Sequence, residues 1–162
     1  MKIVKGLGLL LIFLLTSCGF HLRGFVDMPS WLDSVAIVIE NANVGLRPAL
    51  RQQLEANHVM VNPSSAQANY LLIIEQDNFS QQIISISAST TPRQYQMIYT
   101  VTFRLQNRKG KPILPSNIVT VSRPSTVNNN RILGSDEEET ILKSEMMRDV
   151  AIQILNRIRQ YH

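Results

Sequence analysis

Hydrophobic and polar positions alternate most regularly between residues 94 and 105. The odd-numbered positions there are apolar or aromatic and the even-numbered positions are polar, with Ile98 as the exception. A period of two places the apolar side chains on one face of a strand, so this segment predicts a strand with one face on a core and the other exposed to water. Three further β-rich segments are predicted to be strands: 35–39, 70–75 with a weaker continuation toward residue 86, and 118–123.

Residues 45–57 are predicted to form a helix. Leu46, Leu50 and Leu54 recur there every four residues, which places them on one helical face. The stretch that follows, 59–67, carries the sequence Pro-Ser-Ser and is predicted to be a connector without regular structure.

The segment from Ser135 onward predicts a second, longer helix. Ser135 and Glu138 have the spacing of a capping box, and the acidic residues at 136–139 lie where the helix dipole is positive. The apolar stripe of this helix recurs every four residues and is widened by a second row: Leu142, Met146, Val150, Ile154 and Ile158, with Met147, Ala151 and Leu155. The element order βαβββα predicts an α+β sandwich, a single domain with two helices packed on one face of a roughly four-stranded sheet.

The first eighteen residues have the pattern of a lipoprotein export signal. Lys2 and Lys5 precede an apolar run, 6–15, which is too short to span a bilayer as a helix, and two small residues then lead to Cys18. This order resembles a bacterial lipobox, which implies removal of the preceding peptide and acylation of Cys18 by a diacylglyceryl group and a further chain on the new amine. The alternative is an ordinary signal peptide that ends near a cysteine.

These features divide the chain into a lipoprotein signal peptide over 1–17, a lipidated tether over 18–33 and one α+β domain over 34–162. Cys18 is the only cysteine, so no internal disulfide is expected. Gly19 follows the cysteine, whereas Asp at this place signals retention at the inner membrane in many Gram-negative bacteria. The resemblance to sorted lipoproteins therefore implies the outer membrane.

The charge of the chain does not indicate nucleic acid as a partner. Without Lys2 and Lys5, the 16 basic residues become 14 against 12 acidic ones, so the formal charge falls from +4 to +2. Nucleic-acid binding requires a concentrated basic stripe. Basic residues do gather between Asp77 and Asp136, where no acidic residue occurs. Such a region meets lipid phosphates or an anionic partner, or is a scatter of solvated strand-edge and turn charges, and the residues alone do not decide between these.

No motif in the sequence indicates catalysis, a metal site or a cofactor. The chain lacks a Gly-rich phosphate loop, a Cys-x-x-Cys pair and a His-Glu-x-x-His run. The three histidines lie at positions typical of surface residues, and the Glu-Glu-Glu sequence at 137–139 is better explained by the helix dipole than by a divalent cation. Ser125 and Thr126 have no activating base nearby in the sequence. We therefore expect a protein that is not an enzyme.

Residues 18–23 read Cys-Gly-Phe-His-Leu-Arg. This resembles the start of the mature chain in the LptE family of lipopolysaccharide-assembly lipoproteins, where Cys-Gly-aromatic-His-Leu-Arg follows the lipobox. The similarity continues in order along nearly the whole mature chain: in Tyr-Gln-Met-Ile-Tyr-Thr-Val at 95–101, in Arg123, in the Asn-rich loop ending at 132–133, and in the last helix around 138–139 and 145–146.

The resemblance implies an α+β domain lodged in the lumen of LptD, a large outer-membrane β-barrel. There the lipoprotein acts as a plug and assembly aid and takes part in delivering lipopolysaccharide to the cell surface. The implied partners are thus an LptD-like barrel, lipopolysaccharide, and the outer membrane through the acyl chains on Cys18. The domain is expected to face the periplasm and to lie within the barrel lumen, with 19–33 as the strap to the lipid.

Family members are also thought to touch lipopolysaccharide through basic residues at a strand tip and at the entry to the last helix. In this chain the family's charge at the tip aligns near Ala88, and a family Lys corresponds to Ser135. The nearest basic residues, Arg93 and Arg131, are therefore the candidates for contact with lipopolysaccharide phosphates, which Arg binds as a planar fork. The alternative is that both are ordinary solvated loop arginines.

Two other functions stay open on the residues alone. One is an unrelated outer-membrane lipoprotein that acts as a scaffold or a lipid-binding module, which predicts a domain without an attached barrel. The other is a lipid-anchored hydrolase, which requires a base and a nucleophile that the fold brings together.

Overall fold

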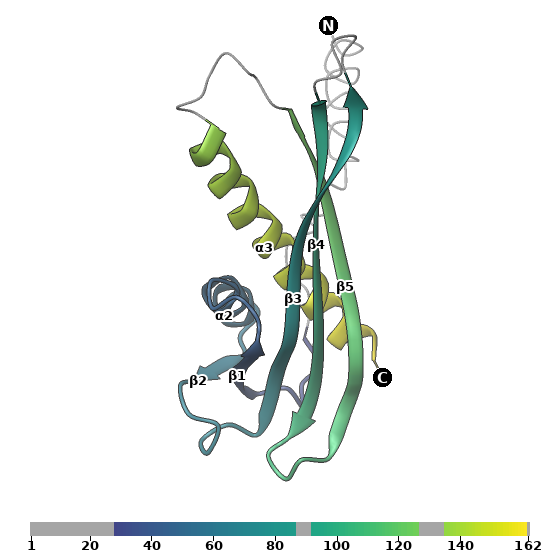
Figure 1. The fold of residues 1–162 in the computed structure, drawn as a ribbon. Coiled ribbons are helices and arrows are strands. Elements are labelled where there is room, and N and C mark those ends of the chain that lie inside the picture. The colour runs from purple at the N-terminus through teal and green to yellow at the C-terminus, as the bar shows by residue number, and fades with distance from the viewer. Residues whose placement is uncertain (1–27, 87–91, 127–134, 162) are drawn as a thin grey trace, which may run out of the picture.

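The computed structural model describes residues 28–86, 92–126 and 135–161. These residues form one five-stranded sheet with both helices on the same face, which confirms the predicted α+β class (Figure 1). The strands lie in the order β2-β1-β3-β4-β5. In chain order the elements are β1 (Ser34–Asn41), α2 (Leu46–Ala56), β2 (Met60–Asn62), β3 (Tyr70–Ile86), β4 (Pro92–Asn107), β5 (Pro112–Thr126) and α3 (Ser135–Gln160).

The short strand β2 corrects the prediction that 59–67 is a connector and that the sheet has about four strands. β2 runs parallel to β1, with Met60 opposite Ser34 and Asn62 opposite Ala36. After α2 the chain reverses at His58, whose φ is 61°, and the Met60 amide then donates to the Asp33 carbonyl at 3.0 Å. The open edge of β1 thus imposes strand structure on a segment with no alternation of its own.

The strands β3, β4 and β5 form a long antiparallel unit (Figure 1). β3 continues to Ile86 as expected, whereas β5 begins six residues before the predicted 118. Prolines at 112 and 115 hide the start of β5 in the sequence. They are tolerated because β5 is an edge strand, where one row of backbone amides needs no partner in the sheet.

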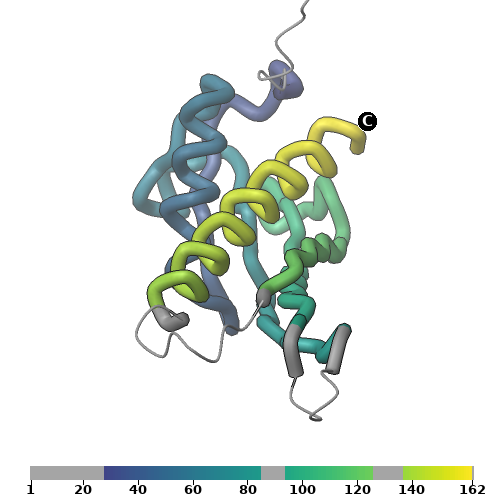
Figure 2. The backbone as a smooth tube through the Cα atoms, turned by 90° about the horizontal axis from the view of Figure 1, so that it is seen from above, coloured from purple at the N-terminus to yellow at the C-terminus, as the bar shows by residue number. Residues whose placement is uncertain are grey.

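The core lies between the sheet and the two helices. The odd-numbered side chains of β4 from Met97 to Leu105 are buried there, as the alternation predicts. The predicted stripe of α3 also faces the core, with Leu142 and Met147 at its partly buried margin. α3 packs on β4, β5 and α2, while α2 packs on β1 and β2, so that the two helices together cover one face (Figure 2).

Candidate functional site

The face of the long strands opposite the helices is broad and accessible. Its position follows from the pairing, because residues directly opposite each other on antiparallel strands point to the same side. Tyr99 points into the core, so its neighbour Thr100 points outward, together with its partners Asn78 and Thr120. The hydroxyl oxygens of Thr100 and Thr120 lie 3.1 Å apart, which confirms that they share this side.

Four successive rows on this side contain no charged residue, and we call them the uncharged face. Each row crosses β3, β4 and β5 in turn: Gln76, Thr102 and Ile118; Asn78, Thr100 and Thr120; Ser80, Ile98 and Ser122; Gln82, Gln96 and Pro124. All of these positions are exposed or half-buried. With 17 % charged residues in the chain, about two charges are expected in such a set from average composition. The face therefore offers hydrogen-bond donors and acceptors without fixed charge.

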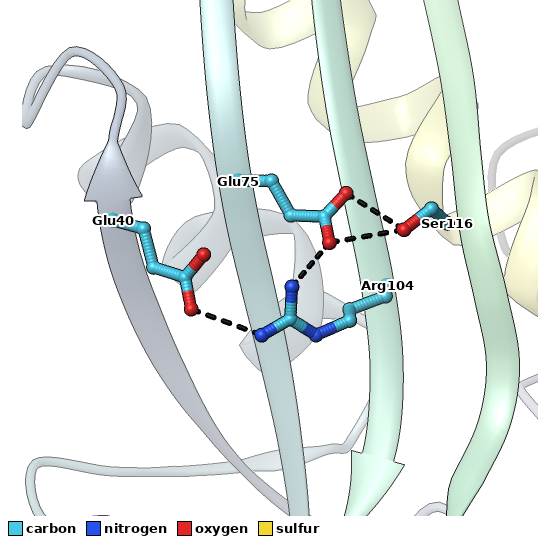
Figure 3. A network of polar contacts seen from close by, with 4 residues as sticks. All are labelled: Glu40, Glu75, Arg104 and Ser116. Carbon is cyan, nitrogen blue, oxygen red and sulfur yellow. Dashed lines mark hydrogen bonds and ion pairs between the residues drawn. The ribbon is translucent and has the colours of Figure 1, made fainter.

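A charged network borders the uncharged face on the side of the β4–β5 turn (Figure 3). Arg104 of β4 donates to Glu75 of β3 and, over 3.0 Å, to Glu40 of β1. The Ser116 hydroxyl of β5 lies 2.8 and 2.9 Å from the two Glu75 carboxylate oxygens. The network thus joins four strands, from the parallel part of the sheet to its edge.

Two irregularities in the strand pairing place this network. The partner of Ile74 is Phe103 and that of Gln76 is Thr102, so Glu75 is an extra residue in β3. A second shift lies in the pairing of β4 with β5. Phe103 pairs with Asn117 and Leu105 pairs with Leu114, so two residues of β5, one of them Ser116, lie opposite Arg104. Bulges increase the local twist and re-aim side chains. Here they turn Glu75 and Ser116 toward the guanidinium of Arg104.

The network keeps its charges fixed. Burial alone would raise the pKa of the Glu75 carboxyl, but the Ser116 hydroxyl and the Arg104 guanidinium outweigh this and lower the pKa. The hydrogen bond to Glu75 is the main cause of the raised pKa of Arg104. Both groups are therefore ionised at neutral pH, and the network is an ion-paired clamp rather than a proton donor or acceptor.

On the helix side, Asp77 and Tyr99 tie the sheet to the helical layer. The Tyr99 hydroxyl donates to Asp77 at 2.8 Å, and the Asn43 amide, just before α2, donates to the same carboxylate at 3.0 Å. Burial and this hydrogen bond raise the pKa of Tyr99. Phe79 stacks on Tyr99 with ring centroids 3.8 Å apart, and the Lys143 ammonium of α3 lies 5.8 Å from the Phe79 ring. This arrangement fixes α2 and α3 against the strands.

The sequence-predicted site residues fall almost entirely outside the described structure. Cys18 and Arg131 lie outside the described residues, and Arg93 is the second residue of β4, with its side chain outside the described part. Their proposed roles stay predictions. Sequence reasoning found the β4 part of the uncharged face but missed the parts contributed by β3 and β5, and it missed the Arg104 network.

The described residues offer no group of three or more His, Cys, Asp or Glu that could hold a metal ion. Within the same residues, neither helix combines the length and the apolar character needed to cross a membrane. His58 is an exposed residue of the turn after α2.

Comparison with known proteins identifies relatives along most of the chain. The sequence is 27 % identical over 150 residues to the LPS-assembly lipoprotein LptE of Pectobacterium atrosepticum, a match that covers 92 % of this chain and 80 % of that protein. It is 25 % identical over 154 residues to the LPS-assembly lipoprotein LptE of Yersinia pestis, covering 94 % of this chain and 73 % of the relative.

Solved structures share the fold. Lipoprotein B from Nitrosomonas europaea has a TM-score of 0.69 at 22 % identity, covering 87 % of this chain and 90 % of that one. A minor lipoprotein from Acinetobacter baumannii has a TM-score of 0.65 at 20 % identity, covering 79 % and 91 %. The family model described as lipopolysaccharide-assembly matches residues 32–158. Because this match spans most of the chain, the chain belongs to the LptE family.

Proposed function

We propose that this chain is an outer-membrane lipoprotein that fills the lumen of an LptD-type β-barrel, assists the assembly of that barrel and takes part in delivering lipopolysaccharide to the cell surface. Its membership of the lipopolysaccharide-assembly family supports the general role. The names of its relatives, LPS-assembly lipoproteins, point the same way. Family membership also argues against an unrelated lipoprotein.

The uncharged face is the observation that supports a position inside a barrel. The interior of a large outer-membrane barrel is polar and wet. A fixed charge pressed against such a wall must find a partner or lose its hydration at a cost. Hydroxyl and amide side chains both donate and accept hydrogen bonds, so Thr, Ser, Asn and Gln adapt to a polar wall or to water trapped against it. Nine of the twelve positions in the four rows carry such groups, and the other three are Ile98, Ile118 and Pro124.

The anchor in this proposal is Cys18. Each buried methylene of its acyl chains contributes about 0.8 kcal/mol, and several chains together hold the protein at the membrane firmly. Residues 1–17 are removed as the signal peptide, and 19–33 connect the lipid outside the barrel wall to the domain within. The domain faces the periplasm and acts in this proposal by binding the barrel and lipopolysaccharide rather than by catalysis.

Arg93 and Arg131 are the proposed contacts to lipopolysaccharide. Arg93 is placed by its backbone near the end of the β3–β4 hairpin, since its neighbours Pro92 and Gln94 pair with Ile86 and Ser85. Lipopolysaccharide carries clustered phosphates, which guanidinium groups bind through two parallel hydrogen bonds.

The plug proposal is tested by placing charge on the uncharged face. Thr120 and Ser122 are exposed on β5, and the double variant Thr120→Glu/Ser122→Glu adds two carboxylates there. Gln52 of α2 and Gln153 of α3 are exposed on the helical layer, so Gln52→Glu/Gln153→Glu is the matched control with the same change in net charge.

Each variant is purified through a carboxyl-terminal tag from outer membranes in mild detergent. We expect wild type and the control to recover a large β-barrel protein in equal amount, and Thr120→Glu/Ser122→Glu to lose it with an unchanged melting temperature. Equal recovery from the two double variants would overturn the role of the uncharged face. If the wild-type chain recovered no β-barrel protein, the proposal that it fills a barrel would be overturned.

A further inference from the structure

The turn between β4 and β5 carries three exposed cations within four residues: Arg108, Lys109 and Lys111, with Gly110 between the lysines. We call residues 108–111 the basic turn. Gly110 has a φ of 83°, a conformation that suits glycine. The Asn107 side-chain oxygen accepts hydrogen bonds from the amides of Lys109 and Lys111 at 3.0 and 2.9 Å. The lysines are therefore presented from a turn of fixed shape.

The two lysines have no ion-pair partner among the residues that the structure describes. Arg108 is anchored to the neighbouring loop, because its amide donates to the Asn69 carbonyl at 2.9 Å and its guanidinium to the Ala66 carbonyl at 3.2 Å. The nearby carboxylate of Asp33 accepts two hydrogen bonds from the Asn69 amide, at 2.9 and 3.0 Å. The basic turn itself contains three cations and no acidic residue, so it carries a net positive charge.

The chain segment that leads to the predicted lipid anchor lies beside this turn. Trp31 packs edge-to-face on Tyr70 with ring centroids 5.2 Å apart, and Tyr70 pairs with Asn107, the residue before the basic turn. Met28, three residues before Trp31, is the first described residue. The ten residue steps from Cys18 to Met28 span at most about 35 Å when fully extended. An acylated Cys18 therefore keeps Met28 within about 35 Å of the membrane, so this end of the molecule can reach the lipid headgroups.

We propose that the basic turn binds the anionic headgroups of the phospholipid leaflet in which the acyl chains of Cys18 are embedded. The inference rests on the proposed acylation and not on the barrel. Anionic phospholipids attract basic residues near the surface, by about fivefold in affinity per Lys or Arg, and this attraction falls off within the Debye length. Lys109 and Lys111 supply the contact, while Arg108 fixes the turn to the body of the domain. The opposite end of the strands, the β3–β4 hairpin, then points away from this leaflet (Figure 1).

The test measures how close the basic turn lies to lipid headgroups. The acylated full chain is placed in vesicles of phosphatidylcholine, with or without phosphatidylglycerol. Because Cys18 carries the lipid, a second cysteine is the only free thiol. Ser65→Cys, exposed in the loop that contacts Arg108, carries a fluorophore, and Ser122→Cys on the uncharged face is the distant label. Quenching by a nitroxide on the lipid headgroup reports proximity.

We expect quenching at position 65 to rise when phosphatidylglycerol is present, to fall again with added salt, and to exceed quenching at position 122. The double variant Lys109→Glu/Lys111→Glu is expected to return it to the level of neutral vesicles. The control Arg51→Glu/Arg148→Glu, which makes the same charge change at exposed positions of α2 and α3, is expected to leave it unchanged.

The proposal would be overturned if quenching at position 65 were the same with and without phosphatidylglycerol, or if both double variants reduced this quenching equally. These vesicles contain no barrel, so such a result leaves the plug proposal standing. A chain that mass spectrometry shows to be without acyl groups would overturn both this inference and the proposed anchoring.

Discussion

The network around Arg104 gives a quantitative prediction about the stability of the sheet. Arg104 stands between the carboxylates of Glu40 and Glu75, and Ser116 also donates to Glu75. Glu75→Gln removes one charge and leaves Arg104 paired with Glu40. Arg104→Met keeps most of the side-chain volume but leaves two carboxylates without their cation. The second substitution is therefore expected to be the more damaging.

The magnitude follows from the exposure of these groups. Arg104 and Glu75 keep 32 % and 21 % of their side-chain surface exposed, so the pair lies between a buried and a surface ion pair. Hydrogen bonds to charged groups contribute about 1.5–3 kcal/mol, and exposed ion pairs less than about 1 kcal/mol. We expect Glu75→Gln to lower the free energy of unfolding by about 1 kcal/mol. Arg104→Met is expected to cost about 2–3 kcal/mol, less than a broken, fully buried pair.

Urea denaturation at pH 7 and at pH 3 checks both the size and the cause. The pKa of Glu75 is lowered in the folded state from its usual 4.5. The contribution of its carboxylate is therefore fully present above pH 4.5 and is lost as the pH falls through the folded pKa. At pH 3 the difference between wild type and Glu75→Gln is expected to shrink. Arg104→Met is expected to recover part of its loss as the Glu75 carboxyl, left without its cation, becomes protonated.

The double variant Glu75→Gln/Arg104→Met provides the control for coupling. Once Arg104 is absent, removing the Glu75 charge relieves repulsion from Glu40, so the double variant is expected to be no less stable than Arg104→Met alone. Strictly additive effects of the two substitutions, or costs that are the same at pH 7 and pH 3, would refute the electrostatic reasoning.

Three further predictions concern the core, the anchor and the lipid contact. Val150 is fully buried on α3, so Val150→Asp is expected to destabilise the domain by about 4 kcal/mol, measured by thermal or urea unfolding, whereas an unchanged melt would show that this side of α3 does not face the core. Cys18→Ala is expected to block acylation and leave an uncleaved or soluble species on membrane fractionation, and a protein of normal size in the outer membrane would exclude the lipobox. Arg93→Asp/Arg131→Asp is expected to weaken lipopolysaccharide binding in a pull-down without changing the melting temperature, and equal binding would mark both as ordinary surface residues.

The sequence predicted those elements whose pattern is continuous. β4 has no extra residue along the uncharged face. Its alternating apolar and polar residues therefore correspond directly to a buried side and an exposed side. In β3 the extra residue Glu75 reverses the phase. Before Glu75 the even-numbered residues, such as Ile74, point to the helix side of the sheet. After Glu75 the odd-numbered residues, such as Asp77, do so, and the alternation therefore appears broken along the chain. The same effect concealed the β3 part of the uncharged face, which is four of its twelve positions.

The remaining features depend on contacts that no local pattern records. Glu40 and Arg104 are 64 residues apart in sequence and meet only because β1, β3 and β4 are neighbours in the sheet. β2 is a strand because the edge of β1 is available to it. Asn107 and Gly110 are residue types that favour a turn, but the place of the basic turn beside the chain segment leading to Cys18 depends on the pairing of Tyr70 with Asn107.

Site-specific cross-linking in cells tests the plug most directly. A photoreactive residue at Thr120, on the β5 edge of the uncharged face, is irradiated in living cells, and its adducts are purified and identified. If this chain fills a barrel, Thr120 is expected to form one major adduct with a large outer-membrane β-barrel protein. Adducts with periplasmic proteins alone, from a chain that also purifies without a barrel, would contradict the account.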